Sequence, residues 1–462
     1  MSTLDRSIFK AYDIRGIVDR NLGPDVVRSI GLAVGARVKA AGGTEVVVGR
    51  DGRLSGPLLA GALSEGLRDA GVGVVDIGQV TTPIVYYGTF ELGTASGVAV
   101  TGSHNPPDYN GLKMVVGGDA IHGESITRLG AEIAAGQHTP VPAAQRGGLR
   151  EVSLTQRYID RIVGDVKLAR PMKIAIDCGN GVAGAVAPAL FKALGCEVTE
   201  LFCEVDGTFP NHHPDPAHPE NLQDLIRCLA ATDCEIGLAF DGDGDRLGVV
   251  TKKGGIIFPD RQLMLLAQEV LSRNPGGKII YDVKCTRNLA GFVRAHGGVP
   301  EMCRTGHSLV KARLKETGAP LAGEMSGHIF YKDRWYGFDD GLYAGARLLE
   351  ILSGHADPSA VLEALPDSPT TPELQLRCAE GEHFTLVEAI KRTARFEGAT
   401  EVIDIDGVRV EYPDGFGLAR ASNTTPVVVM RFEADNAAAL ARIQAQFRQA
   451  VLAVKPEAEL PF

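Results

Sequence analysis

Three aspartates alternate with two glycines in the segment FDGDGDR, residues 240–246. Because glycine tolerates backbone conformations that other residues avoid, Asp241, Asp243 and Asp245 can all approach one point. At an effective dielectric constant of about 20, two carboxylates about 4 Å apart repel each other by roughly 4 kcal/mol, so such a cluster favours a bound cation. Carboxylate oxygens suit Mg²⁺, Mn²⁺ or Ca²⁺. An isolated motif of this kind could equally be a solvated acidic turn.

Two other metal sites fit the sequence less well. An EF-hand calcium loop starting at Asp241 would need glycine at its sixth position and glutamate at its twelfth, but Arg246 and Lys252 occupy them. A zinc site in NHHPDPAHPEN, residues 211–221, lacks a convincing fourth ligand and is interrupted by prolines. Arg246 is instead placed to meet an anion, which favours a metal-assisted phosphoryl site.

A candidate nucleophile, Ser103, lies in the loop TGSHNPPDYNG, residues 101–111. The segment before it predicts a strand, and Pro106 and Pro107 stiffen the exit, so the hydroxyl would be held at a loop tip. Lys113 makes the site locally basic. Taken alone, the string is also typical of an ordinary turn, since Asn-Pro and Gly-Ser are common there.

Two further loops carry groups that suit a sugar phosphate. Glu324 and Ser326 in GEMSGH can hold neighbouring sugar hydroxyls by hydrogen bonds, although a capped helix start would look the same. The segment RASNTTP gathers five polar side chains around one turn, as a phosphate clamp requires, although a turn rich in serine and threonine is the simpler alternative. These side chains are Arg420, Ser422, Asn423, Thr424 and Thr425.

The elements that must position these loops form a repeating pattern. An apolar, β-branched run is followed by a helix-length segment, a glycine, a second strand, and a third apolar run that leads into a chemical loop. The first runs lie at 44–52, 173–181 and 278–286, and the third runs at 97–106, 236–246 and 321–328. We therefore predict three similar α/β domains with largely parallel sheets, whose loops lie at the carboxyl ends of the strands. From about residue 368 the pattern predicts antiparallel strands and a helix, hence a fourth, α+β domain.

The composition limits the class of protein. At 462 residues, 44% hydrophobic and 23% charged, the chain predicts several globular domains, and no apolar run approaches the roughly 20 residues of a membrane span. The start of the chain lacks the apolar core of a secretory signal, which predicts a cytoplasmic protein. The net charge of −10 argues against nucleic acid, so an anionic substrate needs a local cluster of lysine and arginine. The eight cysteines, without any Cys-x-x-Cys pair, predict reduced, packed thiols.

Taken together and in this order, the four loops resemble those of the α-D-phosphohexomutase superfamily, and within it the bacterial phosphomannomutases/phosphoglucomutases, over essentially the whole chain. The chain also carries the family-like strings KAYDIRG, VGRDGR, VDGTFPNHHPDP, DVKCTR and RTGHS. The resemblance implies four domains in a heart-shaped arrangement around a central cleft. They would span residues 1–150 with the serine loop, 151–254 with the metal loop, 255–367 with the sugar loop, and 368–462 with the phosphate clamp.

The resemblance implies a reversible intramolecular transfer of a phosphoryl group between O1 and O6 of mannose or glucose phosphates. Ser103 would carry the phosphoryl group in the resting enzyme, and Ser103, Asp241, Asp243 and Asp245 would bind Mg²⁺. Glucose 1,6-bisphosphate, or mannose 1,6-bisphosphate, would be both intermediate and activator. It would turn over within the cleft before Ser103 takes back a phosphoryl group.

The resemblance also implies roles for other residues. Arg246 would steady the transferring group, while Lys113, His104 and Arg15 would handle the hydroxyl proton. The sugar and its nonreacting phosphate would contact a larger set, which is Tyr12, Arg246, Lys284, His307, Glu324, Ser326, His328, Arg420, Ser422, Asn423, Thr424 and Thr425.

Three alternatives stay open on the sequence. A phosphoglucosamine mutase shares the chemistry, but its sugar loop usually carries glutamine where Met325 stands. A metal-dependent phosphatase with an aspartate nucleophile would leave TGSHNP and RASNTTP unexplained, and a noncatalytic sensor would lack the serine or an aspartate. Residue types do not decide between mannose and glucose. We further expect a monomer that binds small hexose phosphates and closes its cleft about a hinge near residue 368.

Overall fold

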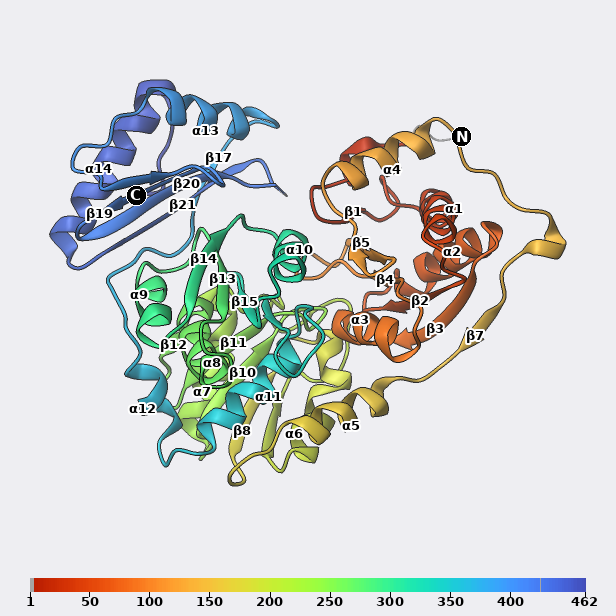
Figure 1. Ribbon diagram of the computed structural model, residues 1–462, viewed down its shortest axis with the longest axis horizontal. Helices are drawn as coiled ribbons and strands as arrows, with labels where there is room; N and C mark the ends of the chain where they lie inside the picture. Colours follow the sequence, from red (N-terminus) through yellow and green to blue (C-terminus); the bar gives the residue numbers. More distant parts are fainter. Residues whose placement is uncertain (1–3, 424) are drawn as a thin grey trace.

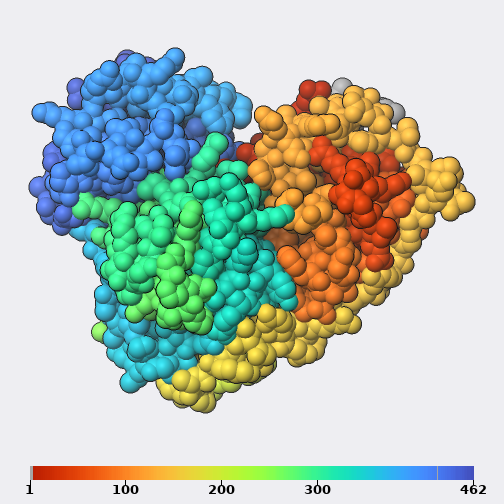
Figure 2. Space-filling model, in the orientation of Figure 1, coloured from red at the N-terminus to blue at the C-terminus, as the bar shows by residue number. Residues whose placement is uncertain are grey.

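The computed structural model describes residues 4–423 and 425–462. Four β-sheets follow one another along the chain, each with its own helices, and Figure 1 shows the four units grouped around a common centre. In Figure 2 the surface is notched between the last unit, drawn in blue, and the first, drawn in red and orange. The predicted fold class, three α/β units and a C-terminal α+β unit, is confirmed. The exact domain boundaries stay a prediction.

The first unit is built around the strand predicted at 44–52. Its elements are β1 (Ile14–Ile17), α1 (Pro24–Ala40), β2 (Glu45–Arg50), α2 (Gly56–Asp69), β3 (Gly73–Gln79), α3 (Thr82–Glu91), β4 (Gly97–Val100), β5 (Tyr109–Val116), β6 (Asp119–Ala120), α4 (Glu124–Ala134) and β7 (Leu149–Glu151). The strand order is β1-β5-β4-β2-β3-β7, with β6 on β5, and β2 pairs in parallel with β3 and β4. Val46 and Val48 pack on one face of the sheet and Val47 on the other, so β2 is buried on both sides.

The second and third units repeat a shorter version of this sheet. The second contains α5 (Thr155–Asp165), β8 (Lys173–Asp177), α6 (Ala187–Ala193), β9 (Glu197–Leu201), α7 (Gln223–Ala231), β10 (Ile236–Phe240), β11 (Leu247–Thr251) and β12 (Ile256–Ile257), in the order β12-β11-β10-β8-β9. The third contains α8 (Pro259–Arg273), β13 (Lys278–Asp282), α9 (Asn288–Ala295), β14 (Val299–Cys303), α10 (His307–Thr317), β15 (Leu321–Gly323), β16 (Ile329–Tyr331), α11 (Gly341–Leu352) and α12 (Pro358–Glu363), in the order β14-β13-β15-β16. In each of these sheets the strand that comes first in the chain, β8 or β13, pairs in parallel with both of its neighbours. Helix α11 packs on strands of both sheets, and one hydrophobic core spans the two units.

The fourth unit departs from the repeat, as the sequence predicts. It contains β17 (Leu374–Arg377), α13 (Glu382–Thr393), β18 (Glu401–Ile403), β19 (Val408–Tyr412), β20 (Gly415–Ala421), β21 (Val427–Ala434) and α14 (Ala437–Val454). All of its strand pairs are antiparallel, in the order β17-β21-β20-β19-β18. Asn436 caps α14 by accepting from the Ala439 amide, and Ile443 and Phe447 of that helix are fully buried against the sheet. Short 3-10 turns at Arg6–Ile8, Ala143–Gln145, Val182–Ala185 and Pro219–Leu222 complete the secondary structure of the described residues.

The four chemical loops lie where the strands end. The serine loop follows β4, the aspartate loop follows β10, the GEMSGH loop follows β15, and the RASNTTP segment runs from β20 into β21. In the first three units these are the carboxyl ends of strands in parallel pairs, which is where ligands bind in open α/β sheets. Of the helices in the described parts of the chain, none is both long enough and apolar enough to cross a bilayer.

Candidate active site

The four loops meet at a cavity of about 400 Å³ that all four units line. Its walls contain nearly every side chain that the sequence singled out, namely Tyr12, Arg15, Ser103, His104, Lys113, Arg246, Lys284, His307, Glu324, Ser326, His328, Arg420, Ser422, Asn423 and Thr425. The three aspartates of the DGDGD segment do not line the cavity but lie fully buried beside it. Thr424, also predicted in the clamp, lies outside the described residues.

The backbone of the serine loop is held in a conformation that serine rarely adopts. Ser103 has φ of +49°, in the left-handed region, where an L residue is strained. Its amide donates to Oγ1 of Thr101 at 2.8 Å, and that hydroxyl donates in turn to Asp51 at 2.8 Å. Asp51 also accepts from the Gly102 amide. The side chains of Thr101 and Asp51 therefore hold the backbone of this turn and orient the Ser103 side chain.

A buried arginine fixes the same loop from its other side. Arg53 has an exposed fraction of 2%, and its guanidinium donates to the carbonyl oxygens of Ser103 at 2.8 Å and Asn105 at 2.6 Å. It donates as well to the carbonyls of Pro106 and Tyr109. Arg53 lies in the VGRDGR string, but nothing in that string indicates that its partners are fifty residues away.

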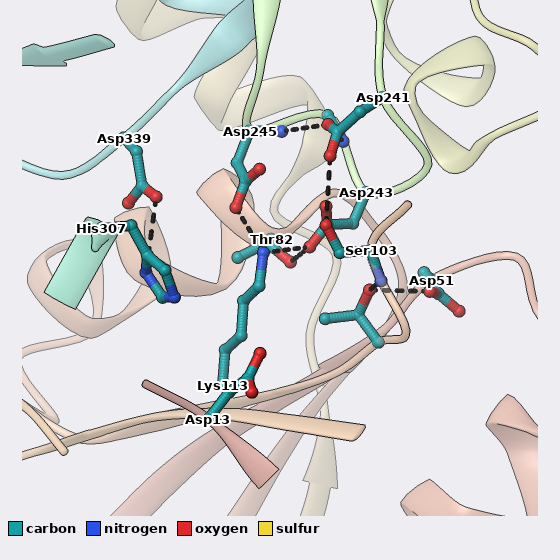
Figure 3. Close-up of polar contacts among 12 residues, drawn as sticks. Asp13, Asp51, Thr82, Ser103, Lys113, Asp241, Asp243, Asp245, His307 and Asp339 are labelled. Atoms are coloured by element: carbon teal, nitrogen blue, oxygen red, sulfur yellow. Dashed lines mark hydrogen bonds and ion pairs between the residues drawn. The ribbon is translucent and has the colours of Figure 1, made fainter. Parts of the chain in front are cut away.

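Two glycines let the aspartate loop fold against the serine loop. A Cβ on Gly242 would lie 2.3 Å from the Ser103 carbonyl oxygen, so only glycine allows this approach of two backbones. Gly244 has φ of +77°, which favours glycine. The resulting turn lets one oxygen of Asp241 accept from the amides of Gly244 at 3.0 Å and Asp245 at 3.1 Å. Its other oxygen accepts from the Ser103 hydroxyl at 3.2 Å (Figure 3).

Lys113 supplies the cationic partner of this acidic cluster. Its ammonium donates to Asp243 at 2.8 Å and to Asp245 at 2.5 Å, and all three aspartates lie close enough to share one ion. Burial alone would lower the pKa of Lys113, but the carboxylates of Asp243, Asp245 and Asp241 outweigh it and raise that pKa. Burial raises the pKa of Asp241 well above its usual value, and the other two carboxylates raise it further. The lysine side chain therefore stays protonated inside the cluster.

The donors present in this cluster fit a divalent cation. Lys113 and Arg246 supply two positive charges beside three carboxylates, and the Oδ1 atoms of Asp243 and Asp245 are buried with no hydrogen-bond partner among the described residues. An unpaired carboxylate oxygen in a buried place is costly, and Mg²⁺ prefers such ligands. Asp243 also accepts from the Thr82 hydroxyl at 2.5 Å, so the first turn of α3 in the first unit supports the loop of the second.

Two histidines form the wall opposite the serine loop. His307 and His328 stack with ring centroids 5.5 Å apart, and Nδ1 of each faces Asp339. Lys311 donates to the second oxygen of Asp339 at 2.8 Å. Burial lowers the pKa of His307 well below its usual value, and the Lys311 ammonium lowers it further. His307 is therefore a neutral imidazole near neutral pH. The sequence reasoning missed Asp339 and Lys311, because neither lies in one of the four loops.

Three further cations of the cleft have carboxylate partners that the sequence reasoning missed. Lys284 pairs with Glu373 at 2.8 Å, Arg420 with Asp406 at 3.0 Å, and Arg15 with Asp13. The pair of Lys284 and Glu373 joins the third unit to the first strand region of the fourth. Only the pair of Asp13 and Arg15, two residues apart in YDIRG, had a local signal. The others are contacts between distant segments.

The sugar loop and the N-terminal segment both line the cavity and contact the neighbouring residues Thr305 and Gly306. Glu324 accepts from the Gly306 backbone amide, while Tyr12 donates to the Thr305 carbonyl at 2.6 Å and accepts from the side-chain Nδ2 of Asn423. Burial raises the pKa of Glu324, and the nearby Asp282 raises it as well. Tyr12 thus links the first unit to the third and the fourth across the cavity.

The fold and the site together define a class of protein. It is a multi-domain α/β protein in which a serine hydroxyl touches a buried carboxylate cluster, at the edge of a cavity lined by Arg15, Arg246, Lys284 and Arg420. Although the whole chain has a net charge of −10, these four cations give an anionic ligand local partners in the cavity.

Family models match the chain in four consecutive segments. They describe the phosphoglucomutase/phosphomannomutase α/β/α domains I, II and III at residues 6–139, 156–254 and 258–368, and the C-terminal domain of the same family at residues 373–450. The chain belongs to the phosphoglucomutase/phosphomannomutase family of the α-D-phosphohexomutase superfamily.

Individual relatives match over their whole length. The chain is 58% identical to a phosphoglucomutase of Neisseria meningitidis over 98% of each chain. It is 54% identical to a phosphomannomutase/phosphoglucomutase of Pseudomonas putida, over 100% of this chain and 99% of the relative. Among solved structures, a phosphoglucomutase/phosphomannomutase family protein from Burkholderia thailandensis superposes with a TM-score of 0.94 at 62% identity, over 99% of this chain and 100% of that one.

Proposed function

We propose that this protein is a phosphohexose mutase, which moves a phosphoryl group reversibly between O1 and O6 of glucose and mannose phosphates. The observation that carries this proposal is the contact between the Ser103 hydroxyl and Asp241, inside a cluster that also holds Lys113 and two unpaired carboxylate oxygens. The names of the relatives, phosphoglucomutase and phosphomannomutase/phosphoglucomutase, support the same reaction for this chain.

In this proposal Ser103 carries the phosphoryl group and passes it to a hydroxyl of the bound sugar. Asp241, Asp243 and Asp245 would hold Mg²⁺ together with the oxygens on Ser103, and the ion would supply charge neutralisation for the phosphoryl group. Arg246, whose guanidinium lies 3.8 Å from Asp241 and donates to His328 at 3.1 Å, would bind the transferring group. The fixed backbone of the serine loop supports the role of Ser103 as carrier of the phosphoryl group, because phosphoryl transfer depends mainly on the positions and charges of the groups around it.

The groups that would handle the proton differ in charge. Burial lowers the pKa of His104 well below its usual value, and Arg246 and Arg15 lower it further, so this imidazole is neutral. Its Nδ1 lies 3.2 Å from the Ser103 hydroxyl. The raised pKa of Lys113 favours an electrostatic role for the ammonium over that of a base. Arg15 would orient the serine loop through its contact with Asn105.

The opposite side of the cavity would bind the sugar and its nonreacting phosphate. Glu324 and Ser326 suit the sugar hydroxyls, and Arg420 with Ser422, Asn423 and Thr425 suits the phosphate. The sugar 1,6-bisphosphate would leave this clamp, turn over and rebind with its other phosphate at Ser103. We propose that the protein works as a monomer in the cytoplasm on small sugar phosphates rather than on nucleic acid, with a hinge near residue 368.

The test uses the purified full-length protein. Its intact mass is measured first, and the protein is then incubated with glucose 1-phosphate, Mg²⁺ and a trace of glucose 1,6-bisphosphate. We expect a phosphate-sized mass excess that maps to Ser103 and the formation of glucose 6-phosphate, and the same with mannose phosphates. Release of free phosphate without isomerisation would instead identify a phosphatase.

A further inference from the structure

Two cysteines of the second unit form a thiol contact that the proposed reaction does not use. The sulfur atoms of Cys178 and Cys203 lie 3.6 Å apart, and the Cys203 thiol donates toward the Cys178 sulfur. Cys178 is fully buried, whereas Cys203 is partly exposed to solvent. Every cysteine lies within the described residues, and no other pair of them is joined by a hydrogen bond between thiols.

The local backbone holds these two side chains at the ends of neighbouring strands. Strands β8 and β9 pair in parallel as far as Asp177 and Leu201; Cys178 follows β8 directly, and Cys203 follows β9 after Phe202. The Cys178 amide donates to the Leu201 carbonyl at 3.1 Å. A disulfide has an S–S length of about 2.05 Å, so the sulfurs must approach by roughly 1.5 Å, which side-chain rotation and a small backbone shift can supply.

The loop that follows Cys178 touches the aspartate loop of the active site. Within it, the Gly181 amide donates to the Cys178 carbonyl at 2.7 Å, and the Val182 amide donates to the Gly242 carbonyl at 3.1 Å. A Cβ on Gly181 would lie only 2.9 Å from the Gly242 Cα. With no side chain between the two backbones, a displacement of Cys178 reaches Gly242, which stands between Asp241 and Asp243.

We propose that Cys178 and Cys203 are a dithiol modification site, which a peroxide oxidant closes to a disulfide and a thiol reductant reopens. Closure displaces the backbone at Gly242 and lowers turnover, and this second half rests on the proposed mutase function.

The chemistry balances with hydrogen peroxide as the oxidant. The more accessible Cys203 sulfur attacks one peroxide oxygen, the O–O bond breaks, the thiol proton goes to the departing hydroxide, and water leaves behind a sulfenic acid. The Cys178 sulfur then attacks the Cys203 sulfur, and the S–O bond breaks. The Cys178 proton leaves with the hydroxide as a second water. Both sulfurs are oxidised, and the peroxide is reduced to two molecules of water.

The experiment treats the reduced full-length protein with hydrogen peroxide, alkylates the remaining thiols and measures peptide masses and mutase activity in parallel. We expect a peptide that links Cys178 to Cys203 and lacks two hydrogen atoms. We also expect a loss of kcat on the order of tenfold, the scale that a sub-ångström misplacement of reacting groups produces. Dithiothreitol should restore both. The Cys203→Ser variant should resist, whereas Cys228→Ser, a matched variant at another partly buried cysteine of the same unit, should respond like the wild type.

Each other outcome decides against a defined part of the proposal. Oxidation without the linked peptide overturns the dithiol site, whereas equal inactivation of Cys203→Ser overturns the effect of the disulfide on turnover. Should that variant fail to fold, Cys178→Ala and the peptide masses of the wild type make the same decision. A linked peptide with unchanged turnover overturns the connection to Gly242. A reduced protein without mutase activity counts against the proposed function alone, because the peptide masses still decide the disulfide.

Discussion

Two regions suited to phosphate differ in structure: the reaction centre around Ser103, Lys113 and the three aspartates, and the C-terminal clamp around Arg420 and Thr425. At the centre, Ser103, Lys113 and the three aspartates are each less than 4% exposed, and the serine and aspartate loops are in direct backbone contact. In the clamp, Arg420 is buried beside Asp406, but Thr425 is exposed and the turn lies between two strands of a separate unit. The groups of the centre already contact one another without substrate, whereas the groups of the clamp lie on a separate unit across the cavity. We therefore expect changes at the centre to act on turnover and changes in the clamp to act on binding.

The largest effect should follow from removal of the nucleophile. Ser103→Ala should lower kcat by about 10⁴-fold or more, since no other described hydroxyl contacts Asp241, while the sugar phosphate still binds. Single-turnover assays and calorimetric titration with glucose 6-phosphate measure the two quantities. Ser422→Ala is the matched serine change in the clamp and should mainly raise KM. Equal losses of kcat in the two variants would remove the contrast between the regions.

Removal of the divalent cation tests whether the carboxylate cluster binds Mg²⁺, independently of any change at Ser103. Treatment with EDTA should abolish turnover, and Mg²⁺ should restore it. Mg²⁺ at about 100 times its dissociation constant should also stabilise the fold by roughly 2.7 kcal/mol, visible as a raised melting temperature. Asp243→Asn should lose most of that thermal shift, since it removes one charge from the set of three. A shift that survives in this variant would place the ion elsewhere.

A smaller effect is expected in the clamp. Arg420→Ala should raise KM by about tenfold, the loss of roughly one charge-assisted contact, with kcat changed far less. Steady-state kinetics with glucose 1-phosphate separate the two parameters. Arg442→Ala is the control, because among the described residues this half-exposed arginine of the same unit pairs with Asp414 and stacks on Tyr412, away from the clamp turn. A fall in kcat that exceeds the rise in KM would show that the clamp also positions the reacting phosphate.

The smallest effect concerns pH and the buried His307. Its pKa is lowered by burial and by Lys311, so below about pH 6.5 the unfolded chain binds a proton there that the folded chain does not. By linkage, this residue makes the free energy of unfolding fall as pH decreases, with a slope of at most about 1.4 kcal/mol per pH unit. Urea unfolding between about pH 7 and pH 5 should therefore be less pH-dependent in His307→Asn than in the wild type. If the free energy of unfolding changes equally with pH in His307→Asn and in the wild type, the imidazole is charged in the folded protein.

Much of this architecture could be predicted from the sequence. The strands predicted at 44–52, 173–181 and 278–286 are β2, β8 and β13, and the change to an antiparallel unit follows the change in hydrophobic pattern near residue 368. These predictions succeeded because the hydrophobic pattern of a strand and the residue types of a loop can be recognised within short segments. The side chains expected in the cleft do line one cavity, with Thr424 outside the described residues.

The residues that the sequence reasoning missed share one property. Arg53, Thr82, Lys311 and Asp339 each act through a partner in another segment, as in the bond from Thr82 to Asp243, 161 residues away. The roles proposed for the cleft residues and the domain boundaries stay predictions for the experiments above.

The sequence by itself determined which groups could do chemistry and at which strand ends they would stand, because glycine spacing, β-branched runs and turn residues act locally. Only the tertiary structure decided how the charges are shared. It placed the Lys113 ammonium between Asp243 and Asp245, left two carboxylate oxygens unpaired, and brought Cys178 against Cys203. Such pairings depend on how separate sheets dock, and Coulomb energies depend on distances that no local pattern records.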